Sequence, residues 1–300
     1  QLLNTLLIGI TSGAIYALMA LSIVLVWRST RIINFAQAGQ ALTSTFIGYQ
    51  TLHYVNSFWV ALLVAMFGGA LISALIEVTL MRVLLKHSSS GAIAGVAPII
   101  ATLGLLQVIQ ASITLIWGGG DVLLTPPLSN VGFTIGTNTL VFSPMKLAII
   151  LIVLVLLAVL SLIFQKTSIG LSLRAAAFSP ELARLAGVRV DAVRTLGWAL
   201  SGATGAVAGL LFVTNGNGSF STASSGFSLL LITGFISAVI GGLESLLGSV
   251  VGGLILGILT AFILMYISGS LFFIAPFVIL LLALFIRPQG IFAKKGGRRA

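Results

Sequence analysis

LAIILIVLVLLAVLSLIF, at residues 147–164, contains a single polar side chain, Ser161. A helix of roughly 20 apolar residues is long enough to cross the hydrocarbon core of a bilayer. The strands of a membrane barrel would instead alternate polar and apolar side chains, and this stretch does not alternate. It therefore predicts a membrane-spanning helix and excludes a β-barrel.

The rest of the chain repeats this pattern. The sequence has 300 residues, of which 58% are hydrophobic and 7% are charged. A soluble fold cannot hide so much apolar surface, because a large share of any compact chain faces outward. We therefore expect an all-α polytopic transmembrane helical bundle of about eight to ten spans, forming a single domain over residues 1–300. The nine predicted spans are 4–27, 33–51, 57–81, 95–117, 146–164, 195–213, 227–242, 246–266 and 270–286.

Lys and Arg are distributed unevenly between these spans. They gather around residues 82–87, in the loop 165–194 and in the basic tail 287–300, whereas the connections 118–145 and 214–226 contain none. Positive residues concentrate on the cytoplasmic side of membrane proteins. The sequence therefore predicts a multi-pass protein of the cytoplasmic (inner) cell membrane, with the loop 165–194 and the C-terminus inside. The net charge of +10 follows from this bias, and we expect no nucleic-acid partner.

The second span is unusually polar. Asn34, Gln37, Gln40 and Thr43 recur at every third residue, so they drift slowly around one helical face. Polar side chains in hydrocarbon are costly unless they face protein or water. Two explanations stand about equal: hydrogen bonds between packed helices, or a pore-lining or broken helix beside a substrate path.

The fourth span carries a weaker polar stripe. Gln107, Gln110 and Thr114 follow the same three- or four-residue spacing. The same two explanations apply, and plain packing is favoured over a place on the substrate path.

Glycine pairs at four-residue spacing occur in several spans. Gly9 and Gly13 in the first span, and Gly253 and Gly257 in the eighth, have the small-xxx-small pattern that lets helix backbones approach closely. They predict tight helix packing.

Motifs of enzyme chemistry are absent from the sequence. It has no cysteine, its two histidines lie far apart, and it contains no G-x-x-x-x-G-K-[ST] loop for nucleotide phosphates. We expect no catalytic residue, no metal site and no cofactor in this chain. Glu77 and Glu244 are the carboxylates in or near spans, and solvation or ion pairing is favoured for them over proton coupling.

Residues 174–194 concentrate charge between two apolar runs and contain a short predicted helix. Serine suits the N-cap, proline the first turn and an acid the N-terminal dipole, while glycine suits the C-terminal stop. Its predicted residues are Ser179, Pro180, Glu181, Leu182, Arg184, Leu185, Gly187 and, flanking it, Arg189. So short a helix needs a surface to lie on. That surface is either the lipid interface or a cytoplasmic partner, and the partner is favoured.

The loop 118–145 mixes turn residues with β-branched ones, as in GGGDVLLTPPLSN at 118–130. We expect an ordered external element there, with a short hairpin as one form. An inert connector is about as well supported.

Three stretches carry a family resemblance: GITSGAIYALMALSIVLVWRSTRIINFAQAG (9–39), SIGLSLRAAAFSPELARLAGVRVDAVRTLGWALSGATGAVAGLL (168–211) and ALFIRPQGIF (283–292). With them the sequence resembles the permeases of branched-chain amino-acid ABC transporters of the LivH and LivM kind. The pair Arg28 and Arg31 departs from the more neutral residues expected before Asn-Phe-Ala.

The resemblance implies an ABC-importer permease for branched-chain amino acids. Its implied partners are two cytoplasmic ATPase subunits that bind ATP and Mg, a second permease subunit, an external solute-binding protein and the lipid bilayer. The loop 165–194 would carry the coupling helix that docks on the ATPases. Related permeases carry urea or short amides, which is one alternative. A self-sufficient secondary transporter or channel is the alternative from another class.

Overall fold

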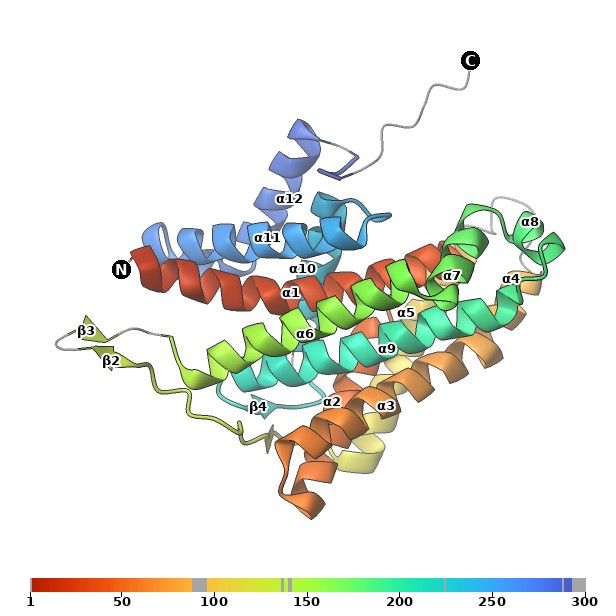
Figure 1. The fold of residues 1–300 in the computed structure, drawn as a ribbon. Coiled ribbons are helices and arrows are strands. Elements are labelled where there is room, and N and C mark those ends of the chain that lie inside the picture. Colours follow the sequence, from red (N-terminus) through yellow and green to blue (C-terminus); the bar gives the residue numbers. More distant parts are fainter. Residues whose placement is uncertain are drawn as a thin grey trace.

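The computed structural model describes residues 2–87, 96–135, 138–139, 142–223, 225–287 and 289–292, and it is predominantly helical (Figure 1). The longer helices are α1 (Leu2–Thr30), α2 (Gln37–Val55), α3 (Phe58–Ile76), α5 (Ala97–Trp117), α6 (Pro144–Lys166), α9 (Val190–Asn215), α10 (Gly226–Gly241) and α11 (Leu246–Tyr266). The shorter ones are α4 (Arg82–His87), α7 (Ser168–Phe178), α8 (Pro180–Leu185) and α12 (Ala275–Ile286). A π-helical turn, Glu77–Met81, joins α3 to α4, and a 3-10 turn, Gly269–Phe272, precedes α12.

Each predicted span overlaps a helix of the structure. Among the described residues, six helical segments are long and apolar enough to cross a membrane. They are Leu2–Thr30, Phe58–Lys86, Ala97–Trp117, Pro144–Lys166, Val190–Asn215 and Leu246–Tyr266. The apolar helices α10 and α12 are shorter, and the polar α2 is not among the six. The prediction of an all-α transmembrane bundle is confirmed, although fewer helices than predicted are long enough to span alone.

The second and last spans begin later than predicted. Residues 31–36 are not helical, so Asn34 precedes α2 and does not share a helical face with Gln37. The Asn34 side chain accepts a hydrogen bond from the Ala36 backbone N–H at 3.1 Å, a local contact that competes with helix formation. At the last span, the 3-10 turn takes up the start of the predicted range, and α12 begins at Ala275.

The centre of the bundle is α1, which packs against α11, α9 and α10. In Figure 1, α1 and α11 lie side by side. Glycine makes this approach possible, because a Cβ added at Gly257 would overlap the backbone of Gly13, and one added at Gly253 would lie 2.6 Å from the Ala17 nitrogen. The tight packing predicted from the glycine spacing is confirmed for this helix pair.

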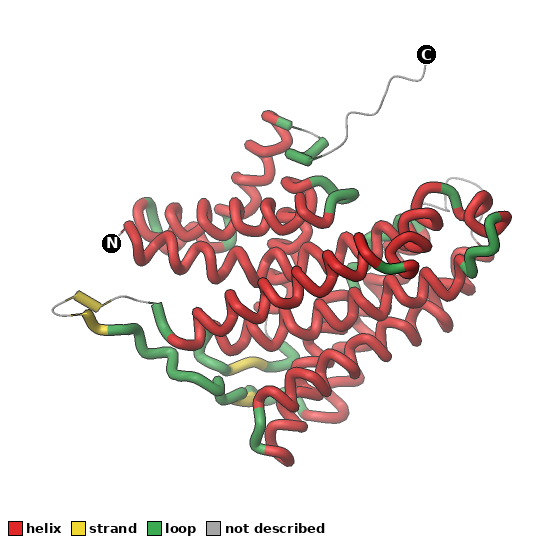
Figure 2. The backbone as a smooth tube through the Cα atoms, in the orientation of Figure 1, coloured by secondary structure: helices red, strands yellow, loops and turns green. Residues whose placement is uncertain are grey.

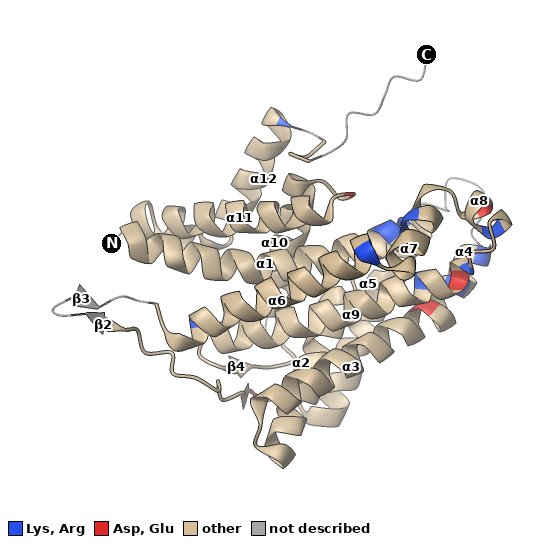
Figure 3. Ribbon diagram, viewed as in Figure 1, with Lys and Arg blue, Asp and Glu red and all other residues tan. Residues whose placement is uncertain are grey.

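The two ends of the bundle differ in structure and charge. One end carries the N-terminus and the short strands β1 (Val122–Leu123), β2 (Thr134–Ile135), β3 (Asn138–Thr139) and β4 (Ser219–Phe220) (Figures 1 and 2). β2 and β3 pair antiparallel, as in the short hairpin that the sequence analysis gave as one form of this loop, and β1 pairs antiparallel with β4. The opposite end, at α4, α7 and α8, gathers most of the described Lys and Arg residues, as Figure 3 shows. Lys146, in the first turn of α6, is an exception.

Candidate functional site

The short helix α8 lies at the charged end and is closed by local hydrogen bonds. Ser179 is its N-cap, whose hydroxyl accepts from the Leu182 N–H at 3.3 Å, and proline occupies the first helical position. At the other end Gly187 has a φ of +82°. Its N–H donates to the Arg184 carbonyl, and the next N–H, of Val188, donates to the Ala183 carbonyl. This pair of bonds is the Schellman motif, so the predicted start of the helix at Ser179 and its predicted stop at Gly187 are both confirmed.

One side chain anchors α8, and two leucines point away from the bundle. Ala183 is 4% exposed and packs in a small cluster with Ala176 of α7 and Val190 of α9. Leu182 is 61% exposed and Leu185 is 85% exposed. Exposed apolar side chains on a rigid, capped helix form a surface suited to a protein partner.

Charged groups surround these two leucines. Arg184 forms an ion pair with Asp191 at 3.5 Å, and both side chains are more than half exposed. Glu181 and Arg189 are also exposed. Pairs in this setting contribute little to stability, so these charges remain free to meet a partner.

The helix α7 was missed by the sequence analysis, which predicted only the α8 helix within 165–194. Thr167 caps its first turn by accepting from the Gly170 N–H at 3.2 Å. At Gly170 a Cβ would collide with the Ile163 and Phe164 carbonyls at the end of α6, so glycine permits the sharp turn between the two helices. The Thr–x–x–Gly pattern was the available signal for this start.

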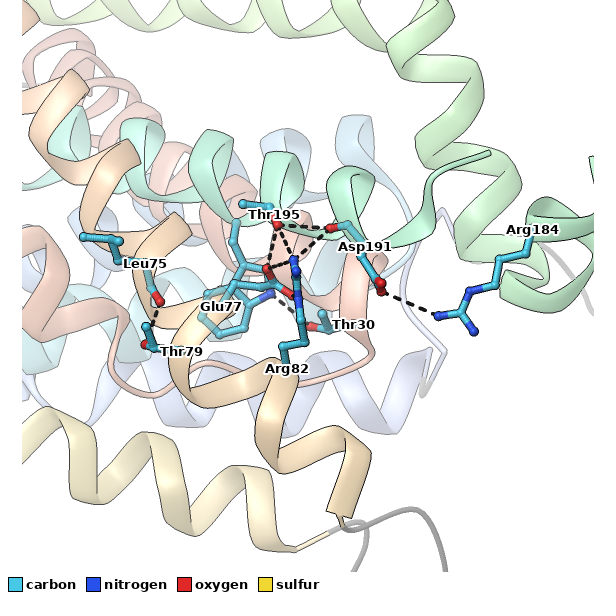
Figure 4. Close-up of polar contacts among 9 residues, drawn as sticks. Thr30, Leu75, Glu77, Thr79, Arg82, Arg184, Asp191 and Thr195 are labelled. Carbon is cyan, nitrogen blue, oxygen red and sulfur yellow. Dashed lines mark hydrogen bonds and ion pairs between the residues drawn. The ribbon is translucent and has the colours of Figure 1, made fainter. Parts of the chain in front are cut away.

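Beside α8, a buried carboxylate ties the π-helical turn to α9. Glu77 has a side chain only 1% exposed, and it pairs with Arg82 at 2.8 Å. Thr195 of α9 donates to the same carboxylate at 2.7 Å, and Arg82 in turn donates to the Thr195 hydroxyl at 2.7 Å and to the Asp191 carbonyl at 3.2 Å. Figure 4 shows this cluster next to the Asp191–Arg184 pair.

The π-helical turn explains how Glu77 and Arg82 meet. Residues five apart do not lie on one face of an α-helix, but the widened turn brings them together, with the Arg82 N–H donating to the Glu77 carbonyl. The sequence analysis favoured solvation or ion pairing for Glu77 and Glu244, and the structure shows ion pairs for both, Glu77 with Arg82 and Glu244 with Arg31. The network with Thr195 was not predicted, and the sequence contains no local signal for it.

The polar residues around the start of α2 join three helices. Asn34 donates to the Gln37 side-chain oxygen at 3.1 Å, and Gln37 donates to the Ser201 carbonyl of α9 at 3.2 Å. The Ser201 hydroxyl lies 2.7 Å from the Ser22 carbonyl of α1 and donates to it. Asn34 and Gln37 are fully buried. In the arrangement described here, they connect packed helices.

Gln40 and Thr43 behave differently from Gln37. Gln40 is 1% exposed, yet neither its side-chain oxygen nor its nitrogen has a hydrogen-bond partner among the described residues. Ser73 of α3 is likewise buried without a partner for its hydroxyl in the described part of the chain. The Thr43 hydroxyl donates to the Gly39 carbonyl of its own helix. Gln40 is therefore the residue of the predicted stripe with unused hydrogen-bonding capacity.

The polar stripe of α5 lies on a largely uncovered helix. Only 11% of the apolar window of α5 is buried, and Gln107 and Thr114 are exposed while Gln110 is partly exposed. The packing that the sequence analysis favoured for this stripe is not made within the described chain.

A model of the family "branched-chain amino acid transport system / permease component" matches residues 5–286. Among curated proteins, the permease LivH of Salmonella typhimurium is 26% identical over 298 residues, covering 95% of this chain and 94% of its own length. The probable permease LivH of Methanocaldococcus jannaschii is 29% identical, covering 91% and 87%. BraD of Pseudomonas aeruginosa, also a permease of a high-affinity branched-chain amino acid transport system, is 25% identical, covering 97% and 96%.

Among solved structures, PsaBC from Streptococcus pneumoniae in complex with Fab matches with a TM-score of 0.52 at 15% sequence identity. The match covers 96% of this chain and 92% of that chain. At this identity the similarity concerns the fold, which extends over the whole described bundle.

Proposed function

Because this chain belongs to the family of permease components of branched-chain amino acid transport systems, we propose that it is the membrane subunit of an ATP-driven importer of branched-chain amino acids. The ATPase activity belongs to separate cytoplasmic subunits that bind ATP and Mg. A solute-binding protein delivers the substrate from outside. The chain itself provides the path through the membrane and the surface on which the ATPases act.

The observation that carries this proposal is the geometry of α8. An importer must transmit nucleotide-driven closure of its ATPases to its spans, which requires a rigid element that is both docked and firmly attached. α8 is capped at both ends, is anchored through Ala183, and exposes Leu182 and Leu185. We assign the segment Ser179–Gly187 as the coupling helix.

The exposed polar face of α5 supports a second permease subunit. The exposed Gln107 amide would be costly against lipid tails, because nothing there can hydrogen-bond it, whereas the Thr114 hydroxyl already donates to the Gln110 carbonyl of its own helix. A second permease subunit facing α5 removes that cost. In this arrangement Gln107 and Gln110 lie beside the substrate path between the two subunits.

The charge distribution supports the orientation. The Lys- and Arg-rich end with α7 and α8 faces the cytoplasm, and the strand-bearing end faces outward. The paired strands β1 and β4 and the β2–β3 hairpin then offer an ordered surface to the binding protein. The C-terminal tail beyond Phe292 lies outside the described residues. We place its basic residues in the cytoplasm too; they are Lys294, Lys295, Arg298 and Arg299.

Uptake by the reconstituted complex tests the proposal. The proteoliposomes would contain this chain with its ATPase and permease partners. We expect them to accumulate labelled leucine, isoleucine or valine only when ATP is present on the side of the membrane that carries the ATPases and the binding protein is present on the opposite side. Accumulation of urea or a short amide in place of leucine would contradict the proposed substrate but would agree with the assignment as an importer. Ion-driven uptake by this chain without any ATPase would contradict the importer and favour a secondary transporter.

A further inference from the structure

A cleft of about 700 Å³ opens at the charged end, between α1, α6, α7 and the start of α11. Its polar wall includes three arginines, Arg28 and Arg31 from the α1 end and Arg174 from α7. Glu244 is the acidic residue that lines it. These arginines include the pair whose charge was unexpected in the sequence.

The charges in the cleft do not balance. Glu244 is already paired with Arg31, and both side chains are at least half exposed. Arg28 lies over the Phe164 ring at 5.6 Å and within electrostatic reach of Arg174. Among the described residues, neither Arg28 nor Arg174 forms a hydrogen bond or an ion pair. Glu244 also acts on Arg28 electrostatically, so one carboxylate is shared by three guanidinium groups, and the excess positive charge in the cleft creates a site for an anion.

Most of the remaining wall of the cleft is apolar, with Ser161, Gln165 and Ser245 as its other polar residues. Leu157, Leu160 and Phe164 of α6 face Leu246 and Val250 of α11 across it. The apolar surface continues away from the charged end, because Leu154, three residues before Leu157 on α6, is 55% exposed. The anion that fits this wall therefore carries hydrocarbon chains that extend along α6.

We propose that this cleft binds an anionic phospholipid of the cytoplasmic leaflet. The phosphate would accept hydrogen bonds from Arg28 and Arg174, and the acyl chains would lie along α6 and α11. Basic pockets between membrane helices on the cytoplasmic side have the chemistry that anionic headgroups require. The proposal rests on the orientation of the chain and is independent of the transported substrate.

Native mass spectrometry of the complex purified with its partner subunits tests the site. The complex would be titrated with dioleoyl-phosphatidylglycerol and, separately, with dioleoyl-phosphatidylcholine. We expect tighter binding of phosphatidylglycerol, and about fivefold weaker binding for Arg174→Gln, since a basic residue in contact with the anionic headgroup contributes about a factor of five. In the double variant Arg28→Gln/Arg174→Gln, the affinity for phosphatidylglycerol should fall on the order of 30-fold. The double variant Arg28→Lys/Arg174→Lys keeps both positive charges and should retain most of the affinity.

Lys166→Gln is the matched control, because Lys166 is exposed at the end of α6 near the cleft but does not line it. It should bind phosphatidylglycerol as the wild type does. Arg174 is exposed, so its variant is expected to fold even if the double variant does not. Equal phosphatidylglycerol affinity in Arg174→Gln and wild type would overturn the proposal, as would an equal loss in Lys166→Gln. Competition by inorganic phosphate as strong as that by phosphatidylglycerol would overturn the lipid assignment and leave a simple anion site.

Discussion

Thr195 of α9 donates a hydrogen bond to the buried carboxylate of Glu77 on the π-helical turn, with 2.7 Å between Thr195 Oγ1 and Glu77 Oε2. These residues are 118 positions apart in sequence. The contact lies one turn from the start of α9, directly after the proposed coupling helix. The carboxylate and Arg82 therefore tie the start of α9 to the π-helical turn that follows α3.

The Glu77 cluster should matter for stability much more than the other Arg–Glu pair. Glu77→Ala leaves Arg82, whose side chain is 25% exposed, without its buried partner, and we expect a loss of about 3 kcal/mol in the free energy of unfolding. Glu244→Ala breaks a pair whose members are 50% and 72% exposed, and should cost less than about 1 kcal/mol. Thermal unfolding of the two purified variants measures the difference. Similar melting temperatures for both would contradict the importance of the buried cluster.

Leu182→Asp should weaken ATPase association by at least about tenfold. Burying a leucine contributes roughly 1.5–3 kcal/mol, and Leu182 is exposed in the chain alone. Arg184→Ala, which breaks only an exposed pair, should have a smaller effect. Co-purification of the ATPases with each variant is the measurement. Full retention of the ATPases by Leu182→Asp, with altered membrane contact, would support a helix that lies only on lipid.

Gly187→Ala should loosen the end of α8 without creating a clash. Nothing lies within 4 Å of a Cβ at this position, but the φ of +82° is unfavourable for alanine by about 1–2 kcal/mol. We expect weaker ATPase binding and slower ATP-driven uptake. Gly187→Asn is the control, since asparagine tolerates this conformation better. If both variants transport like the wild type, rigidity of α8 is not required.

Gln37 and Gln40 should respond differently to replacement by leucine. Gln37→Leu removes hydrogen bonds to Asn34 and Ser201 and leaves buried groups without partners, which should cost about 1–3 kcal/mol of stability. Gln40→Leu removes no hydrogen bond found in the described residues and should leave stability nearly unchanged. If Gln40 lies on the substrate path, Gln40→Leu should reduce uptake while complex assembly and the melting temperature remain unchanged. Unchanged uptake would remove Gln40 from the path.

The proposed orientation can be tested with single cysteines, because the chain has none of its own. Leu185→Cys on α8 and Val131→Cys near the strand-bearing end both replace exposed side chains. In intact cells an impermeant maleimide should label the cysteine at position 131 and spare the one at position 185. Labelling with the reverse pattern would invert the topology.

The sequence by itself determined where the long apolar helices lie and how α8 begins and ends, although α7 was missed. Span position depends on the length of an apolar run, which is a local property, so the predicted ranges fall on helices of the structure. The caps of α8 rest on hydrogen bonds within a few residues, as between Ser179 and Leu182. The three-residue spacing of polar side chains was less informative at the start of α2. There the Asn34 side chain accepts a hydrogen bond from the Ala36 N–H, and the helix begins only at Gln37.

Only the tertiary structure decided which polar residues meet. The residues that meet come from segments far apart in the chain, as in the pairs Glu77–Thr195 and Gln37–Ser201. The same holds for Arg28 and Arg174, which line the cleft at the charged end. A polar residue in an apolar span must find a partner somewhere, and its spacing along one helix does not say on which other helix that partner lies. The packing of α1, α3 and α9 supplies that information, because it decides which faces touch. It leaves Gln40 without a hydrogen-bond partner among the described residues and Gln107 exposed.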